Sequence, residues 1–336
     1  MRREINRQIV LVSRPPQQGW VTEDQFRLIE TPIREPEAGE LLIRNHWLSL
    51  DPYMRGRMNA ARSYAPPQAL NEVMLGSTAG EVVASRHPEF SVGDHVVGRL
   101  GWQEYALSKG DGLVRVDATR APLQTYLSVL GMPGVTAWIG LFDICQPRAG
   151  ETVVITAASG AVGSVVGQLA KLHGCHVVGI AGGTAKCRYV IDELGFDDCL
   201  DYKAGEFWPA LKAATPHRID CLFENVGGEI FDTLLGRMNE HARIALCGMI
   251  AQYNSAPYPV RNLSSLLVNR VRLQGFIVTE LMDRWPVALA ALDQYWSAGQ
   301  LHYRESIVEG IEQAPRALIG LLRGENFGKQ LVKLRA

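Results

Sequence analysis

The chain has 336 residues, enough for two domains with sizeable cores; 47% are hydrophobic and 21% charged, as in soluble globular proteins. Its 34 basic residues are balanced by 35 acidic ones, which gives no electrostatic footprint for nucleic acid. No apolar run approaches the roughly 20 residues that span a bilayer, and the N-terminal stretch lacks the apolar core of a signal peptide. We therefore expect a cytoplasmic protein that binds neither nucleic acid nor membrane.

The first 120 or so residues contain short strand-like segments separated by Gly, Pro and Asp. Short strands at this spacing predict a β-rich, partly closed barrel. The predicted strands are Ile9 to Ser13, Phe26 to Pro32, Glu40 to Leu50, Gly80 to Ser85, His95 to Gly98 and Trp102 to Leu107.

From about Met132 the pattern changes to alternating strands and helices, which is typical of a parallel sheet. We expect an α/β protein with a β-rich domain at 1–130, a doubly wound Rossmann domain at 131–300, and a C-terminal segment at 301–336 that returns to the first domain. The predicted strands here are Val153 to Thr156, Val177 to Ile180, Asp220 to Glu224, Arg243 to Cys247, Leu273 to Ile277 and Gln330 to Leu334, and the predicted helices include Leu263 to Asn269, Trp285 to Ala298 and Ala314 to Arg323.

The segment ETVVITAASGAVGSVVGQLAKLHGCHVVGIAGGTAK predicts a strand, a turn of small residues, a helix and a second strand. This order is the first half of a dinucleotide-binding fold, with the pyrophosphate at the turn and at the helix N-terminus. Gly160 lets the backbone approach the phosphates, and Gly163 lets the helix pack closely on the strand. The first glycine of the usual pattern is Ala158 here. An ordinary strand-to-helix turn is the alternative.

The end of the second predicted strand indicates which dinucleotide binds. NAD-binding proteins usually place an acidic residue there, about 20 residues after the turn, to hold the ribose 2′-hydroxyl. The segment 181–184, AGGT, has no carboxylate and is followed by Lys186. Small residues beside a cation would accept a 2′-phosphate that an acid would repel, which favours NADP(H). A solvated lysine in the first turn of a helix is the alternative for Lys186.

Polar residues follow two later strands, where the cofactor crevice of such a sheet lies. Asn225 precedes Gly227 and Gly228 and could hydrogen-bond a ribose, although a simple helix-start turn would also explain the glycines. Tyr253 ends the segment after the next strand, where a phenol could donate a proton or hold an oxygen. Packing of the aromatic ring under a loop is the alternative for Tyr253.

In the N-terminal part, the irregular stretch LSLDPYMRGRM follows a predicted strand. Tyr53 within it, and Tyr64 beyond it, are candidates to line a substrate cleft; packing or surface exposure is the alternative for each. The segment GMPGVTAW begins the second domain, and its Pro133–Gly134 pair predicts a turn or a helix start.

The six cysteines are scattered, with no C-x-x-C pair, and the first 144 residues contain none. This pattern predicts neither a disulfide framework nor a Cys/His zinc site in the first domain. We therefore expect no metal. Without zinc to polarise a carbonyl, hydride transfer to an already electron-poor carbon is favoured over alcohol oxidation.

Six motifs occur in order and span nearly the whole chain: LSLDPYMRGRM, GMPGVTAW, AASGAVGSVVGQLAKLHGCHVVG, ENVGGEIFD, ARIALCGMIAQYN and GENFGKQLVKL. In these motifs the chain resembles the zinc-free medium-chain dehydrogenase/reductase superfamily, and within it the group of leukotriene 12-hydroxydehydrogenase/prostaglandin reductase, plant alkenal double-bond reductases and bacterial curcumin reductase. The resemblance implies a GroES-like first domain, NADPH-dependent reduction of the carbon–carbon double bond of α,β-unsaturated aldehydes and ketones, and a homodimer joined through the edges of the nucleotide-domain sheets.

The resemblance also assigns roles by matching motif. Tyr253 would be the proton donor, and Tyr53 and Tyr64 would line the substrate cleft. Cofactor contacts would come from Gly160, Ala161, Val162, Gly163, Lys186, Tyr202, Asn225, Cys247, Gly248, Met249, Ile250, Tyr253, Phe276, Ile277, Val278 and Asn326, with Met132 and Thr136 of the GMPGVTAW segment as further candidates.

The expected reaction delivers a hydride to the β-carbon of an enal or enone and a proton to the α-carbon. An NADPH:quinone reductase is the alternative enzyme, and a non-catalytic NADPH-binding protein is the alternative from another class. The physiological substrate and the stereochemistry do not follow from the sequence.

Overall fold

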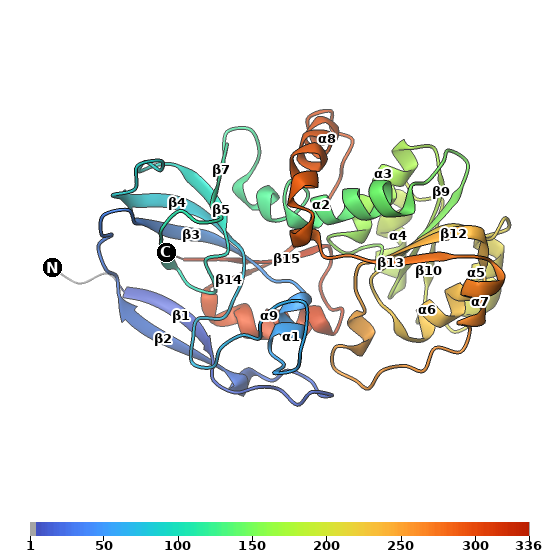
Figure 1. The fold of residues 1–336 in the computed structure, drawn as a ribbon, viewed down its shortest axis with the longest axis horizontal. Helices are drawn as coiled ribbons and strands as arrows, with labels where there is room; N and C mark the ends of the chain where they lie inside the picture. The colour runs from blue at the N-terminus through green and yellow to red at the C-terminus, as the bar shows by residue number, and fades with distance from the viewer. Residues whose placement is uncertain (1–4, 336) are drawn as a thin grey trace. The chain divides into compact units, whose positions relative to one another are not determined.

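The computed structural model describes residues 5–335, and the chain forms two compact units. One unit extends to Ser128 and takes up the chain again from Glu305, and the other is Val129–Arg304. Figure 1 shows the chain in order of sequence, with both units labelled by element.

The first unit is rich in β-structure. Its elements are β1 (Ile5–Leu11), β2 (Phe26–Pro32), β3 (Leu41–Ser49), α1 (Tyr53–Arg57), β4 (Thr78–Ser85), β5 (His95–Gly98), β6 (Tyr105–Ser108), β7 (Val114–Val116), β14 (Glu305–Glu309), α9 (Ala314–Leu322) and β15 (Lys329–Lys333). Strands β1 and β2 pair with each other, and the larger sheet has the order β14-β15-β3-β4-β5-β7, with β6 also paired to β3. The last strand of the chain therefore lies beside β3, close to the segment that carries Tyr53.

The second unit contains a six-stranded parallel sheet. Its elements are α2 (Met132–Trp138), a π-helix (Ile139–Cys145), β8 (Thr152–Thr156), α3 (Gly163–Leu172), β9 (His176–Ala181), α4 (Thr184–Asp192), β10 (Asp198–Asp201), α5 (Phe207–Ala214), β11 (Ile219–Glu224), α6 (Gly228–Leu235), β12 (Met238–Leu246), α7 (Ser264–Val268), β13 (Arg272–Gly275) and α8 (Trp285–Ser297). The strand order is β10-β9-β8-β11-β12-β13, and every pair in it is parallel. The order reverses between β8 and β11, and in sheets of this kind ligands bind at the carboxyl ends of the strands that flank such a point.

Apolar strands covered by helices form the core of the second unit. All five residues of β8 are buried, and so are the last five of β9. On one face, Val154 and Leu222 pack with Leu211 of α5 and Leu234 of α6 in a continuous buried cluster. Figure 1 shows α2 and α3 on the other side of the sheet from α6. The sheet is thus held rigid on both faces, while the loops at its carboxyl edge remain available for binding.

The predicted fold class is confirmed, since a β-rich unit accompanies a parallel doubly wound sheet. The limits of β2 and β5 agree with the prediction, whereas β1 begins at Ile5 rather than Ile9. The polar residues before Ile9 hid this strand: Asn6 is buried and exchanges two side-chain hydrogen bonds with the backbone of Tyr105. Three short strands, β7, β10 and β14, were not predicted, because charged residues interrupt their apolar pattern.

Candidate cofactor and substrate site

The turn from β8 into α3 has the geometry that a pyrophosphate requires. Ala157 adopts a left-handed conformation with φ 52°, and its carbonyl oxygen accepts the N–H of Gly160 at 2.9 Å. A Cβ at Gly163 would collide with the backbone of Ala157, so the helix packs this closely only because a glycine stands there. At Gly160 a Cβ would meet only that carbonyl oxygen, at 3.1 Å, so the side facing away from the turn is open for a ligand. Ala161 and Val162 lie between these glycines, and the positive dipole end of α3 favours an anion there.

Ala158 replaces the usual first glycine without straining the turn. It is fully buried, its φ is not positive, and its N–H donates to the Ile180 carbonyl at 3.0 Å. A Cβ on Gly179 of the adjacent strand would lie 2.8 Å from the Ala158 methyl group. The absence of a side chain at Gly179 therefore provides the space that Ala158 fills.

Two lysines and a tyrosine gather at the carboxyl end of β9. The Tyr202 ring lies so close to Gly182 that a Cβ there would be 2.8 Å from the phenol oxygen. Burial, and after it the charge of Lys203, lower the pKa of Lys186. The Asp201 carboxylate is engaged by the backbone, because it accepts the N–H groups of Gly183 and Lys203 at 2.8 and 3.0 Å. Two neighbouring ammonium groups and a phenol suit a dianionic phosphate.

The ends of β8 and β11 are joined by a buried polar network. Glu224 Oε1 accepts hydrogen bonds from Thr156 Oγ1 at 3.0 Å and from the N–H groups of Val226 and Gly227 at 2.6 and 2.7 Å. Asn225 donates its backbone N–H to Thr156 Oγ1 and its side-chain Nδ2 to the Thr156 carbonyl. The Asn225 side chain is therefore oriented by the protein, with its carbonyl oxygen as the group available to accept a ribose hydroxyl.

The segment after β12 is tied to this network. The N–H groups of Cys247 and Gly248 both donate to the Glu224 carbonyl, at 2.9 and 3.1 Å. Ile250 donates to the Asn225 carbonyl at 3.2 Å, and the Tyr253 hydroxyl accepts the Met249 N–H at 3.5 Å. The predicted residues 247–250, Tyr253 and Asn225 thus form one connected surface at the carboxyl ends of β11 and β12.

The remaining candidates of this unit lie on α2 and after β13. Thr136 is buried, and its hydroxyl donates to the Met132 carbonyl at 2.7 Å, so it is already engaged within α2. The Phe276 ring contacts Phe223 edge-on, with the ring centroids 6.4 Å apart. Ile277 and Val278 follow it and are partly buried.

Tyr53 and Tyr64 belong to the first unit, where a buried ion pair anchors their segment. Lys329 Nζ lies 2.6 Å from Asp51 Oδ1 and donates to the Leu50 carbonyl at 2.9 Å. Burial, with a smaller contribution from Asp51, raises the pKa of Tyr53. Tyr53 is therefore a neutral phenol throughout the physiological range, whereas Tyr64 is 53% exposed.

Asn326 also belongs to the first unit, in the turn before β15. Its side-chain Nδ2 donates to the Gly328 carbonyl at 2.7 Å. This bond leaves the side-chain carbonyl oxygen as the remaining acceptor of the Asn326 amide.

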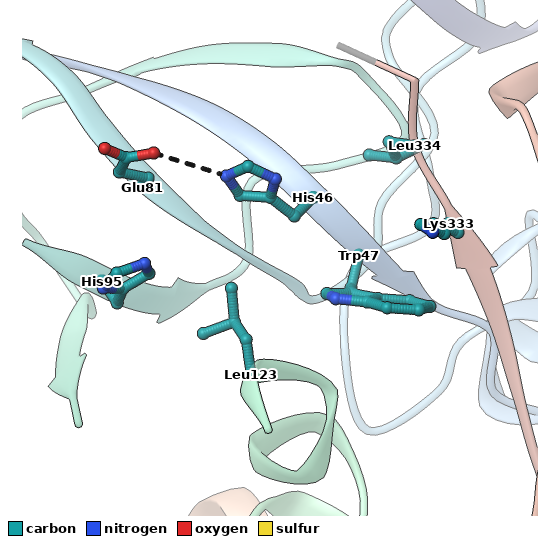
Figure 2. A pocket seen from close by; sticks show the side chains of 7 residues that line it. All are labelled: His46, Trp47, Glu81, His95, Leu123, Lys333 and Leu334. Carbon is teal, nitrogen blue, oxygen red and sulfur yellow. Dashed lines mark ion pairs between the residues drawn. The ribbon is translucent and has the colours of Figure 1, made fainter. Parts of the chain in front are cut away.

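A pocket of about 260 Å³ lies elsewhere in the first unit and is lined by none of the predicted residues. Figure 2 shows His46 and Glu81 facing each other across β3 and β4, with His46 Nε2 3.7 Å from Glu81 Oε2. Burial, and after it the Arg44 charge, lower the pKa of His46, so the ion pair is weak at neutral pH. The residues lining the pocket are His46, Trp47, Glu81, His95, Leu123, Lys333 and Leu334.

Within residues 5–335, no group of three or more His, Cys, Asp or Glu side chains is placed to hold a metal ion. None of the helices in this part of the chain is both long and apolar enough to cross a membrane. All six cysteines are free thiols, and only Cys247 is not fully buried.

Four residues that contact the predicted candidates, or fix the segments that carry them, were not predicted. Lys203 and Glu224 belong to the cofactor end of the sheet, and Asp51 and Lys329 hold the Tyr53 segment. A sequence signal existed for two of them: Lys203 follows Tyr202 directly, and Asp51 precedes the proline of LSLDPYMRGRM. The pairing of Asp51 with Lys329 joins residues 278 positions apart, which no local pattern indicates.

Comparison with known proteins identifies the family. A model of the N-terminal domain of oxidoreductases matches residues 7–116, and a model described as zinc-binding dehydrogenase matches residues 161–294. The chain is 46% identical to the NADPH-dependent curcumin reductase of Escherichia coli over 98% of this chain and 97% of that protein. It is 39% identical to the NADP-dependent 2-alkenal reductase of Nicotiana tabacum over 97% of each chain.

A solved structure shows the same fold at similar identity. The crystal structure of CurA from Vibrio vulnificus in complex with NADPH matches with a TM-score of 0.94 and 47% identity, covering 98% of this chain and 99% of that one. The chain belongs to the medium-chain dehydrogenase/reductase superfamily, to the oxidoreductase group that includes curcumin reductase, 2-alkenal reductase and prostaglandin reductase.

Proposed function

We propose that this protein uses NADPH to reduce the carbon–carbon double bond of α,β-unsaturated aldehydes and ketones. The choice of NADPH over NADH rests on one observation: Lys186 and Lys203 lie near each other and beside Tyr202, and the end of β9 has no carboxylate. The substrate class is supported by the curcumin and 2-alkenal reductases, which share 46% and 39% of their residues with the chain.

The cofactor would be held at three points of the second unit. The turn Gly160–Gly163 would bind the pyrophosphate, Lys186 and Tyr202 the 2′-phosphate, and Asn225 a ribose hydroxyl. The nicotinamide half of NADPH would be surrounded by the segment 247–250, by Met132 and Thr136, and by the segment 276–278. Asn326 is a further proposed cofactor contact.

When bound, NADPH supplies the hydride that the β-carbon of the unsaturated acceptor receives. Negative charge then develops on the carbonyl oxygen, and a hydrogen-bond donor fixed near that oxygen stabilises it. The Tyr253 hydroxyl, held beside the Met249 N–H, would donate to this oxygen and direct a proton to the α-carbon, either itself or through water. Tyr53 would remain a neutral phenol and position the substrate, together with Tyr64.

The proposal is tested by following NADPH absorbance with the purified protein and four acceptors: a medium-chain 2-alkenal, an aryl enone, a quinone and a saturated aldehyde. We expect NADPH oxidation with the alkenal or enone, and little with NADH or with the saturated aldehyde. Oxidation with the quinone alone would instead identify a quinone reductase. NADPH binding without oxidation by any acceptor would identify a non-catalytic protein.

The role of Tyr253 is tested separately by Tyr253→Phe. We expect kcat/KM for the best enone to fall about a hundredfold, in the range that a positioned acid contributes, with the Kd for NADPH unchanged. Full activity of this variant would move the role to Tyr53 or Tyr64.

We also propose a homodimer joined through β13. This strand is the outer edge of the parallel sheet, and all four of its residues are exposed. Beside it, on and near α7, Leu267 is 82% exposed, Val268 66% and Leu263 57%. An open strand edge next to exposed apolar side chains is a surface that a second copy can cover.

Light scattering after size exclusion tests the dimer. We expect the mass of two chains for the wild type and of one chain for Leu267→Asp, because a buried carboxylate at the interface would be unpaired. A monomeric wild type would contradict the proposal.

A further inference from the structure

Glu224 is a carboxylic acid in a fully buried position at the point where the sheet order reverses. Its Oε1 atom accepts three hydrogen bonds, from Thr156 Oγ1, Val226 N–H and Gly227 N–H. Its Oε2 atom is also buried and has no hydrogen-bond partner among the described residues. A purely structural carboxyl group would be expected to satisfy both oxygens, because an unpaired buried polar atom is costly.

The three bonds of Oε1 fix a turn that carries a proposed cofactor ligand. Val226 and Gly227 directly follow Asn225, and Gly227 holds its left-handed φ of 73°. Thr156 also accepts the backbone N–H of Asn225 at 2.7 Å, so the same hydroxyl links Glu224 and Asn225. Losing the acceptor at Oε1 would free two turn N–H groups and the Thr156 hydroxyl together.

The ionised carboxylate suits this arrangement better than the neutral acid. Bonds from N–H and O–H donors to a carboxylate are about twice as strong as bonds to a neutral acceptor. A proton on Oε2 would have no acceptor, and a proton on Oε1 would displace a donor. Burial acts in the opposite sense and raises the pKa of Glu224 to about 7. Cys247, on the segment after β12, is the titratable group that interacts with it, and burial and Glu224 raise the pKa of that thiol to about 12, so it stays neutral.

We propose that Glu224 is a positioning residue for the cofactor: its ionised carboxylate holds the 225–228 turn, and with it the Asn225 side chain, in the conformation that binds the nicotinamide ribose. This inference rests on the proposed use of NADPH. It predicts that cofactor affinity rises with pH across the titration of Glu224, because only the ionised form holds all three donors strongly.

The test is the Kd for NADPH, measured by NADPH fluorescence between pH 6 and 8.5, in wild type, Glu224→Gln and Glu305→Gln. Glu305 is a matched control, because burial raises its pKa also to about 7, it has an unpaired buried oxygen, and it lies on β14 in the first unit. We expect wild type and E305Q to bind about tenfold more tightly at pH 8 than at pH 6. E224Q, which keeps an oxygen acceptor but no charge, should bind more weakly than wild type at pH 8 and should depend less on pH. The pH dependence that all three proteins share belongs to the 2′-phosphate, whose second pKa is about 6.

A second variant keeps the inference testable if E224Q folds poorly. Thr156→Val preserves shape but removes one donor to the carboxylate, so the midpoint of the affinity–pH curve should move to higher pH. Three results would overturn the inference while leaving NADPH binding intact. They are the same pH dependence in wild type and E224Q, an unmoved midpoint in T156V, and an affinity that falls with rising pH. A wild-type protein that binds no NADPH at any pH would instead overturn the proposed function, and the inference with it.

Discussion

Lys329 Nζ lies 2.6 Å from Asp51 Oδ1, and both side chains are almost completely buried. Lys329 is on the last strand of the chain, and Asp51 is two residues before Tyr53. Asp51 Oδ2 also accepts the Ser49 hydroxyl, so the carboxylate is bonded on both oxygens. The C-terminal strand thereby fixes the segment that carries a proposed substrate-binding tyrosine.

Lys329→Met should destabilise the protein by about 3–5 kcal/mol, because it leaves Asp51 buried without its partner charge. Lys171→Met is the matched control: Lys171 pairs with Asp197 at 2.7 Å, but both side chains are about one-third exposed. That variant should lose less than about 1 kcal/mol. Urea unfolding measures both, and equal losses would contradict the anchoring role of the buried pair.

Lys186→Ala should raise the Kd for NADPH at least about tenfold and leave the Kd for NADH unchanged, because the lost charge-assisted hydrogen bond is specific to the 2′-phosphate. Lys203→Ala should act in the same direction. Lys212→Ala serves as the control, since this lysine lies over the Trp208 ring on α5, away from the β9 end. The assignment fails if K186A weakens NADPH and NADH binding equally.

Two glycine substitutions in the β8–α3 turn should separate binding from folding. Gly160→Ala meets one tight contact, the Ala157 carbonyl at 3.1 Å, so it should cost less stability than Gly163→Ala, while its methyl group obstructs the pyrophosphate and weakens NADPH binding. Gly163→Ala collides with the Ala157 backbone and should cost roughly 1–3 kcal/mol of stability. Thermal unfolding with NADPH titration would distinguish the two; a G160A variant with wild-type affinity would argue against a phosphate at this turn.

The stability of the protein should depend on Glu224 between about pH 4.5 and 7. The pKa of this group is raised from 4.5 to about 7 in the folded protein, so in this interval the folded state keeps a proton that the unfolded chain has released. The contribution of Glu224 to the free energy of unfolding is therefore fully present below pH 4.5 and is lost as the pH rises to about 7. The shift corresponds to roughly 3 kcal/mol.

Glu224→Gln removes this loss, because an amide stays neutral at every pH. The free energy of unfolding of E224Q, relative to wild type, should therefore rise by up to roughly 3 kcal/mol between pH 4.5 and 8. Denaturant unfolding at pH 4.5, 6 and 8 measures it, and a difference that is constant with pH would contradict the assigned ionisation. The ionised carboxylate that we propose for cofactor binding is thus held at a cost in stability.

Much of the second unit could be predicted from the sequence, because its signals are local. A buried strand, a glycine turn and a helix follow one another within about 20 residues, from Val153 to Leu172, and the structure contains them in that order. The absence of an acidic residue after β9, which favours NADP(H), could also be predicted from the sequence. The position of the left-handed residue could not be predicted: it is Ala157, one residue before Ala158.

Contacts between distant segments could not be predicted in this way. Lys203 lies near Lys186 because β10 pairs with β9. The distance between two lysines that are 17 positions apart in different elements cannot be predicted from local sequence. The β14 strand has only two apolar residues, Ile307 and Val308, between polar ones, and it is fixed by pairing with β15 rather than by its own pattern. The roles of the predicted tyrosines remain predictions for the same reason, since they depend on where a substrate lies.

The fate of the transferred hydride distinguishes reduction of the carbon–carbon double bond from reduction of the carbonyl group. NADPH carrying deuterium at C4 of the nicotinamide, prepared in both stereochemical forms, would be supplied with a 2-alkenal, and the product would be analysed by NMR. We predict a saturated aldehyde with deuterium at the β-carbon from one of the two forms. Deuterium at the carbonyl carbon of an unsaturated alcohol would show carbonyl reduction and contradict the proposed function.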